Sequence, residues 1–214
     1  MDKATFEYHH AILNHPAAQG AVEYLTETRH LSQDSVQSFL LGYVEHPLPG
    51  HELYAGKLSI PYWTRSGFVS MRFRTLPEMV DGVPQPFEGP KYLSVHGDMP
   101  RMFNADALNR REPYVCICEG EIDTISASQA GLPAVGIAGV NGWRDYFARC
   151  FNGYEAVYVL CDNDDKGQGA TFGEKVAGQI ANSRMVLMPA GHDVNSFLVA
   201  EGPEALRARL EADK

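Results

Sequence analysis

The second half of the chain alternates short, continuous apolar runs with stretches of helical periodicity. Runs of this kind, bounded by turn-forming residues, are typical of strands buried on both faces. We identify four of them, at residues 114–118, 134–138, 155–161 and 184–188. Strands that alternate with helices predict an α/β domain with a central, mostly parallel sheet flanked by helices.

The first half of the chain has a different pattern. Residues 4–19 and 20–29 predict helices, whereas proline recurs between residues 46 and 112 and excludes long helices there. Strands are predicted at residues 58–60 and 68–74, because both runs are rich in apolar residues and bounded by turn formers. This half therefore predicts a small mixed α+β region.

Two arginines alternate with apolar residues in the second of these strands. Because side chains of a strand alternate between its faces, Arg72 and Arg74 are expected on the face opposite Met71 and Phe73. Guanidinium groups bind phosphate with paired hydrogen bonds, so this face is a candidate phosphate-binding surface. The alternative is an ordinary solvated polar face.

Charge is distributed unevenly along the chain, whose net charge is −9. Residues 1–49 carry two basic and six acidic residues, for −4; residues 50–112 carry eight and seven, for +1; residues 113–214 carry eight and fourteen, for −6. If nucleic acid binds, the middle segment is where it should bind. We divide the chain into a smaller α+β basic subdomain, residues 1–112, and the α/β domain, residues 113–214.

Composition is that of a globular protein of 214 residues, with 44% hydrophobic and 21% charged residues. No apolar run approaches the ~20 residues of a membrane span, and the N-terminus lacks a signal-peptide pattern, so a cytoplasmic location without membrane contact is expected. Neither the cysteines nor the early histidines are spaced as metal ligands, so buried free thiols, surface histidines and no zinc are expected. These residues are Cys116, Cys118, Cys150, Cys161, His9, His10, His15 and His30.

Acidic residues end two of the predicted strands. Glu119 follows the first run, and Asp162 and Asp164 follow the third. The carboxyl ends of parallel strands meet at one edge of a sheet, so these side chains are expected to converge. Carboxylates at one edge would hold a hard divalent cation, whose natural substrate group is a phosphate. The alternative is that these acids only cap helices and form turns.

These acids also carry a family resemblance. The segment Glu119-Gly120-Glu-Ile-Asp123 resembles the first motif of Toprim domains, and Asp162-Asn-Asp164 followed by Gly167 resembles their DxD motif. Toprim domains occur in DnaG-type primases, topoisomerases and some nucleases. The resemblance implies a Toprim fold for the α/β domain and strengthens the expectation of metal binding.

The resemblance extends over nearly the whole chain in the right order. The opening helices through Tyr43, the arginine-bearing strand and the segment Pro90-Lys91-Tyr92-Leu93 are similar to the catalytic core of DnaG-type primases. The Pro-Ala-Gly-His-Asp193-Val-Asn195 segment resembles the third acidic motif of that core. An ordered set of this kind favours a primase over other Toprim proteins.

The sequence departs from the family at three points. Asn195 stands where the family usually has a second aspartate, which predicts a weaker metal position. Asn104 stands where the family often has a lysine, and nearby Arg101 is a candidate substitute. The 214 residues leave no room for the zinc-binding and helicase-binding domains of a full-length bacterial primase. We therefore expect a compact form, as in bacteriophages, with the zinc module on a separate chain.

The resemblance implies template-directed synthesis of short RNA primers on single-stranded DNA from ribonucleoside triphosphates, with a replicative helicase as a further possible partner. Two or more Mg²⁺ or Mn²⁺ ions are expected. The expected catalytic residues are Glu119, Asp162 and Asp164, which with Asp193 form the expected metal ligands. Expected phosphate or template ligands are Arg72, Arg74, Lys91, Arg101 and Tyr92, the last also a stacking face. Expected supporting residues are Asp123, Gly120, Gly167 and Asn195.

Two other functions remain open from the sequence. A Toprim nuclease would use the same metal site but would not need a triphosphate-binding segment at residues 50–112. The other is a replication-associated binding module that has lost catalysis. Asn195 and the absent lysine are the features that favour this alternative. A topoisomerase is disfavoured because its tyrosine nucleophile lies in large extra domains that have no counterpart in these 214 residues.

Overall fold

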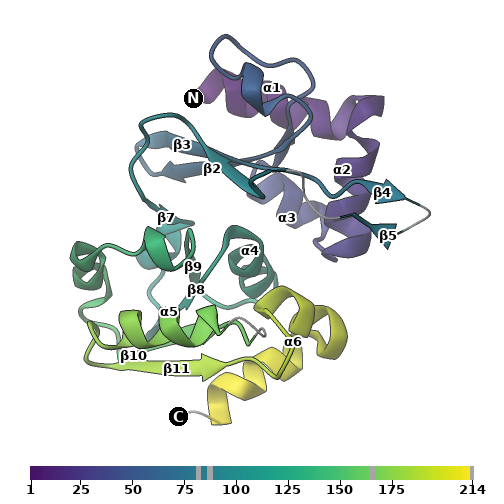
Figure 1. The fold of residues 1–214 in the computed structure, drawn as a ribbon. Coiled ribbons are helices and arrows are strands. Elements are labelled where there is room, and N and C mark those ends of the chain that lie inside the picture. The colour runs from purple at the N-terminus through teal and green to yellow at the C-terminus, as the bar shows by residue number, and fades with distance from the viewer. Residues whose placement is uncertain (81–82, 86–88, 164–166, 213–214) are drawn as a thin grey trace. The chain divides into compact units, whose positions relative to one another are not determined.

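The computed structural model describes residues 1–80, 83–85, 89–163 and 167–212 (Figure 1). These residues form two compact units, Met1–Asp98 and Met99–Lys214. The division falls earlier than the expected boundary after residue 112, because a short strand in the intervening segment pairs with the sheet of the second unit. Each unit is described by itself below.

The helices of the first unit follow the predicted pattern with one interruption. Pro16 ends the first helix at His15, whose backbone is extended, and a short turn of helix follows. Ser32 caps a later helix by accepting a hydrogen bond from the Ser35 N–H. The elements are α1 (Asp2–Asn14), η1 (Pro16–Ala18), α2 (Gln19–Glu23), η2 (Tyr24–Thr28), α3 (Gln33–Ser38) and η3 (Glu52–Tyr54).

The first unit contains a four-stranded antiparallel sheet in the order β1-β2-β3-β6. Its apolar face carries Met71 and Phe73, and Phe73 stacks on Tyr54 with ring centroids 3.7 Å apart. Both predicted strands are present and longer than expected. The bounds are β1 (Gly42–Tyr43), β2 (Leu58–Thr64), β3 (Gly67–Arg74) and β6 (Tyr92–Ser94), with a separate hairpin of β4 (Met79–Val80) and β5 (Val83–Pro84).

The second unit is built on a five-stranded sheet in the order β11-β10-β8-β9-β7. Four strands are parallel, as predicted, and β7 pairs antiparallel with β9 at the edge. The bounds are β7 (Met102–Phe103), β8 (Tyr114–Cys118), β9 (Ala134–Ile137), β10 (Ala156–Cys161) and β11 (Ser183–Leu187). The four apolar runs are thus the four parallel strands of an α/β sheet.

Helices cover both faces of this sheet, which explains why its strands are apolar throughout (Figure 1). Along β8, Cys116 and Cys118 pack with α4 and α6, whereas Val115 and Ile117 pack with α5 and η6. The elements are η4 (Ala105–Asn109), α4 (Glu121–Gln129), η5 (Val140–Gly142), η6 (Asp145–Phe151), α5 (Gln168–Ala177) and α6 (Val194–Ala212), the last kinked at Gly202. Within the described ranges, no helix is long and apolar enough to span a membrane.

The expectation of buried thiols holds for three cysteines and is wrong for the fourth. Cys116, Cys118 and Cys161 are buried in the parallel strands, but Cys150 is exposed. It lies in η6, a 3-10 helix whose buried side chains include Phe147 and Phe151, so the intervening position faces outward.

Candidate metal centre and arginine face

The structure brings two of the predicted acids together at one edge of the sheet. Glu119 directly follows β8, and Asp162 directly follows the adjacent parallel strand β10. The backbone N–H of Asp162 donates a hydrogen bond to Glu119 Oε1 at 3.2 Å. Strand pairing therefore brings together two residues that are 43 positions apart in the sequence, as expected from parallel topology. Asp164 lies outside the described residues.

The first turn of α5 packs directly against this pair. Gly167 caps the helix in the left-handed conformation, with φ of 64°, which glycine adopts without strain. A Cβ added to Gly169 would lie 2.0 Å from the carbonyl oxygen of Asp162 and 2.7 Å from Glu119 Oε1. Only glycine permits this approach, which places the positive end of the helix beside two carboxylates. We did not identify Gly169 from the sequence, although Gly-x-Gly at a helix start was a usable signal.

Asp123 and Asn195 form a buried connection between α4 and α6. Asp123 Oδ1 accepts a hydrogen bond from the Asn195 backbone N–H at 3.0 Å. The side-chain amide of Asn195 donates to Ser126 Oγ at 2.8 Å, and Asn195 is 1% exposed. Asn195 therefore joins the two helices, and Asp123 approaches Gly120, where an added Cβ would lie 3.2 Å from Asp123 Oδ2.

Asp193 caps α6. Its Oδ1 accepts a hydrogen bond from the Ser196 N–H at 2.6 Å, and its own N–H donates to Ser196 Oγ at 3.0 Å. This reciprocal pair is a capping box in which serine replaces the usual glutamate or glutamine. The preceding loop is tied to the end of β10, because the Asn163 N–H donates to the His192 carbonyl at 2.9 Å. Asp193 thus lies on a loop anchored next to Asp162, with one carboxylate oxygen engaged by the helix.

The acids at this edge act electrostatically on the neighbouring thiols. Burial, followed by the charges of Glu119 and Asp162, raises the pKa of Cys161 to about 12. Burial also raises the pKa of Cys118 well above its ordinary value, and the carboxylates of Asp123 and Asp162 add to the effect. Both thiols are neutral at pH 7, so the donors at this edge are oxygens. Oxygen donors of this kind fit hard divalent cations such as Mg²⁺ or Mn²⁺.

In the first unit, β3 presents its two arginines on one face, as the alternation predicted. Arg74 is only 2% exposed, and its Nη1 donates a hydrogen bond to the Tyr92 hydroxyl. The guanidinium carbons of Arg72 and Arg74 lie 4.7 and 4.9 Å from the Tyr92 ring centroid, and that of Arg74 lies 5.2 Å from the Tyr24 ring. Tyr92 therefore contacts both guanidinium groups, a contact the sequence did not predict. We call Arg72, Arg74 and Tyr92 the arginine face.

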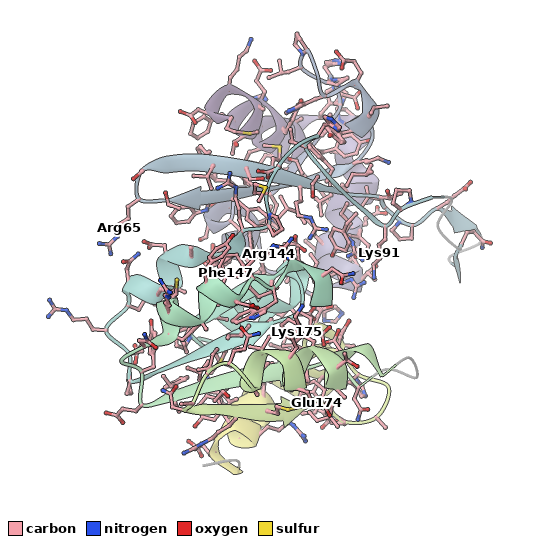
Figure 2. The ribbon with its side chains drawn as sticks, turned by 60° about the vertical axis from the view of Figure 1, so that its left-hand side comes forward. Arg65, Lys91, Arg144, Phe147, Glu174 and Lys175 are labelled. Carbon is pink, nitrogen blue, oxygen red and sulfur yellow. The ribbon has the colours of Figure 1, made fainter. Side chains whose placement is uncertain are left out.

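The burial of Arg74 is electrostatically unusual. Among the described residues, Arg74 Nε is buried and has no hydrogen-bond partner. A buried cation is costly unless it is compensated, and the contacts of Arg74 with the Tyr24 and Tyr92 rings offset part of this cost. Lys91 is exposed and directly precedes β6, the strand that pairs with β3 (Figure 2). Arg101 lies in the second unit, directly before β7.

Asn104, which stands where the family often has a lysine, has a structural role in this chain. Asn104 has a left-handed backbone, with φ of 54°, a conformation that asparagine tolerates better than most residues. Its side-chain amide donates to the Ala134 carbonyl at 2.8 Å. Asn104 therefore fixes the turn after β7 to the start of β9.

Comparison with known proteins agrees with this architecture. Residues 116–198 match the Toprim-like family. The structure of the DnaG primase catalytic domain bound to ssDNA aligns with a TM-score of 0.72 and 20% identity, over 99% of this chain and 77% of that chain. The DNA primase of Pseudomonas putida is 23% identical over 250 residues, which cover 98% of this chain but only 37% of that primase. The chain thus has the fold of a DnaG primase catalytic core, with a Toprim-like domain at residues 116–198.

A phage protein is more similar in sequence. The Gene 57 protein of Mycobacterium phage D29 is 38% identical over 163 residues, which cover 74% of this chain and all of that protein. The chain belongs to the same family as this Gene 57 protein. This relationship fits the compact, phage-like form expected from the sequence.

Proposed function

We propose that the chain is the catalytic core of a primase that synthesises short RNA primers on single-stranded DNA by metal-dependent nucleotidyl transfer. The observation that supports this most directly is the convergence of Glu119 and Asp162 at adjacent strand ends within a DnaG-type fold. A magnesium site at this position would bind the triphosphate of an incoming nucleotide, and the fold supplies the context for a polymerising enzyme.

Four acids are proposed to hold two or more Mg²⁺ or Mn²⁺ ions: Glu119, Asp162, Asp164 and Asp193. When bound, such ions lower the pKa of the attacking 3′-hydroxyl and stabilise the pyrophosphate leaving group. Glu119 is oriented by the Asp162 N–H, and Gly169 holds the start of α5 against both residues. Asp123 and Asn195 are proposed to support the metal-binding acids indirectly, because their hydrogen bonds join α4 to α6.

The arginine face is proposed to bind the phosphates of the nucleotide or of the template backbone, with Lys91 as a further cation. Arg74 contacts two tyrosine rings, and its Nε–H, which has no hydrogen-bond partner among the described residues, would donate a hydrogen bond to a bound anion. The contacts of Tyr92 with both guanidinium groups favour a role in positioning them over the base-stacking role expected from the sequence. Arg101 stays a predicted template contact on the second unit.

Single-stranded DNA and ribonucleoside triphosphates are the proposed substrates. Support for the template comes from the related primase catalytic domain whose structure contains bound ssDNA. A net charge of −9 predicts weak, salt-sensitive binding of DNA by this chain alone. A separate zinc-binding primase subunit and a replicative helicase are proposed partners that would raise template affinity.

The test is primer synthesis by the purified chain on single-stranded DNA with labelled ribonucleotides, repeated as extension of a pre-annealed primer. Asp162→Asn removes one carboxylate charge and should abolish both reactions while leaving the fold intact by circular dichroism. Glu174→Gln is the matched control, because it makes the same charge change at an exposed position on α5 (Figure 2). It should retain full activity.

The two reactions separate the possible outcomes. Extension without initiation would show that the catalytic site works and that start-site selection needs a partner. Metal-dependent cutting of DNA without extension would replace the proposal with a nuclease. Full extension by Asp162→Asn would overturn the assignment of the acid pair, and DNA binding without either reaction would indicate a binding module.

A further inference from the structure

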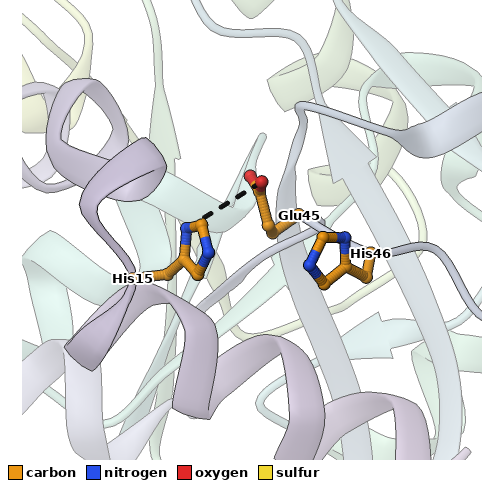
Figure 3. A group of neighbouring side chains, drawn as sticks. All are labelled: His15, Glu45 and His46. Atoms are coloured by element: carbon orange, nitrogen blue, oxygen red, sulfur yellow. Dashed lines mark ion pairs between the residues drawn. The ribbon is translucent and has the colours of Figure 1, made fainter.

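A second group of metal-ligating side chains lies in the first unit. Donor atoms of His15, Glu45 and His46 all lie within 4.8 Å of one another (Figure 3). His15 Nδ1 is 3.9 Å from Glu45 Oε1, and the two imidazole rings are edge to face with centroids 5.9 Å apart. From the sequence we expected the early histidines to be surface residues, because their spacing is not that of a set of metal ligands.

Packing of α1 against the segment around β1 brings these residues together. On one side of β1, His9 Nδ1 is 2.7 Å from the Leu41 carbonyl; on the other, the Leu48 N–H donates to the Tyr8 hydroxyl at 3.0 Å. Glu45 and His46 lie between these two attachments, so they are held beside the C-terminal end of α1. The convergence is thus a consequence of the fold rather than of one flexible side chain.

Proline restricts the backbone on both sides of the group. His15 precedes Pro16 and His46 precedes Pro47, and a residue before proline is confined to extended conformations. His15 has φ of −93° and ψ of 129°, as this restriction predicts. Its Nδ1 also accepts the Ala17 N–H at 3.3 Å, a long hydrogen bond that a metal ion bound at Nδ1 would replace. The two imidazoles are therefore presented from stiff backbone positions.

We propose that His15, Glu45 and His46 bind one Zn²⁺ ion. Two imidazoles and one carboxylate are ligands that zinc prefers, whereas Mg²⁺ prefers oxygen alone. Zinc bonds of about 2.0–2.1 Å place tetrahedral donors roughly 3.4 Å apart. The observed spacing of up to 4.8 Å is wider, and the side chains of His15 and Glu45, which are 41% and 23% exposed, have room to rotate toward a common ion.

The space for the remaining coordination position is a cavity of about 480 Å³, whose lining includes the three ligands, His10, Ala11 and Asn14. Water can occupy the fourth position in such an open site. A bound ion would cross-link the end of α1 to the segment after β1 and so stabilise the first unit against unfolding. The site is independent of the proposed synthesis of primers, and its chemistry differs from that of the acid pair.

The test uses Co²⁺ as a spectroscopic substitute for Zn²⁺, titrated into the full chain in a large excess of Mg²⁺ that saturates oxygen-only sites. One equivalent should produce visible absorption, and Zn²⁺ should displace it. His46→Ala and His15→Ala should each weaken binding at least tenfold. His96→Ala is the matched control, because it removes an exposed histidine of the same unit that does not line the cavity. It should bind as the wild type does.

Three results would overturn the proposal. One is wild-type protein that shows no stoichiometric binding in the presence of Mg²⁺. A second is a His46→Ala variant, folded by circular dichroism, that binds with wild-type affinity. The third concerns the acid pair. Unchanged Co²⁺ absorption in Asp162→Asn is expected, and loss of the signal there would reassign the binding to the acid pair.

Discussion

Replacing Gly169 by alanine should disrupt the acid pair without changing either acid. The added Cβ would lie 2.0 Å from the Asp162 carbonyl oxygen, 2.7 Å from the Asp162 nitrogen and 2.7 Å from Glu119 Oε1. Two of these three atoms are backbone, so rotation of a side chain cannot relieve the overlap. Either the start of α5 or the end of β10 must move.

The size of the movement follows from the distances. Ordinary contact begins at 3.4 Å, so the 2.0 Å approach requires a shift of about 1.4 Å (3.4 − 2.0). Overpacking of this kind costs ~1–3 kcal/mol, and the higher helix propensity of alanine offsets ~1 kcal/mol. The free energy of unfolding should therefore fall by up to about 2 kcal/mol. A misplacement of roughly 1 Å at a catalytic site costs on the order of 10²-fold in rate, so activity should fall much further than stability.

Extension of a pre-annealed primer and guanidinium unfolding measure the two effects in the same preparation. Gly20→Ala is the matched control, because Gly20 lies in α2 and an added Cβ would have no atom within 4 Å. This control should keep its activity and gain up to ~1 kcal/mol of stability. If Gly169→Ala extended primers at the wild-type rate with unchanged stability, the close approach of α5 to the acid pair would be refuted.

Two further predictions concern Asn195 and His51. The Asn195→Asp variant restores the aspartate that is usual in the family. It should lower the free energy of unfolding by ~1–3 kcal/mol in metal-free buffer. A buried carboxylate next to Asp123 would then replace the amide that donates a hydrogen bond to Ser126. The neutral variant Asn195→Ser should be less destabilised at pH 8 than Asn195→Asp. Equal stability of the two variants at that pH would contradict the reasoning. Burial lowers the pKa of His51, whose Nδ1 lies 2.9 Å from the Tyr8 hydroxyl and accepts its hydrogen bond when the ring is neutral. As the pH falls through about 6.5, His51 is therefore protonated in the unfolded state before it is protonated in the folded state. The free energy of unfolding should decrease from pH 7 downward. Unfolding measured across this range should show a smaller decrease in His51→Gln, and an identical pH dependence would show that His51 is not responsible.

The sequence by itself determined the layout of the second unit. Its four parallel strands coincide with the four apolar runs, because strands covered by helices on both faces must be apolar at every position. The same local logic placed Arg72 and Arg74 on one face of β3 and placed Glu119 and Asp162 at neighbouring strand ends. These features depend on hydrophobic periodicity and on the order of the strands along the chain, both of which can be recognised from local sequence.

Tertiary structure decided which of the predicted site residues also form structural hydrogen bonds. Asp193 caps α6, Asn195 joins α6 to α4, and Asn104 fixes a turn, although all three were considered from the family pattern alone. The boundary between the units moved because the two-residue strand β7 is too short to predict before its partner β9 is placed. Hydrogen bonds of this kind join residues that are close only after the helices have packed.

The requirement for glycine at Gly169 and the meeting of His15 with Glu45 and His46 have the same physical origin. Each depends on the distance between a helix end and a strand end, and that distance is set by the side chains packed between them. Local sequence determines where a helix or strand begins and ends and which face it buries. The separations of a few ångströms that turn neighbouring residues into a site are decided only when the whole core closes.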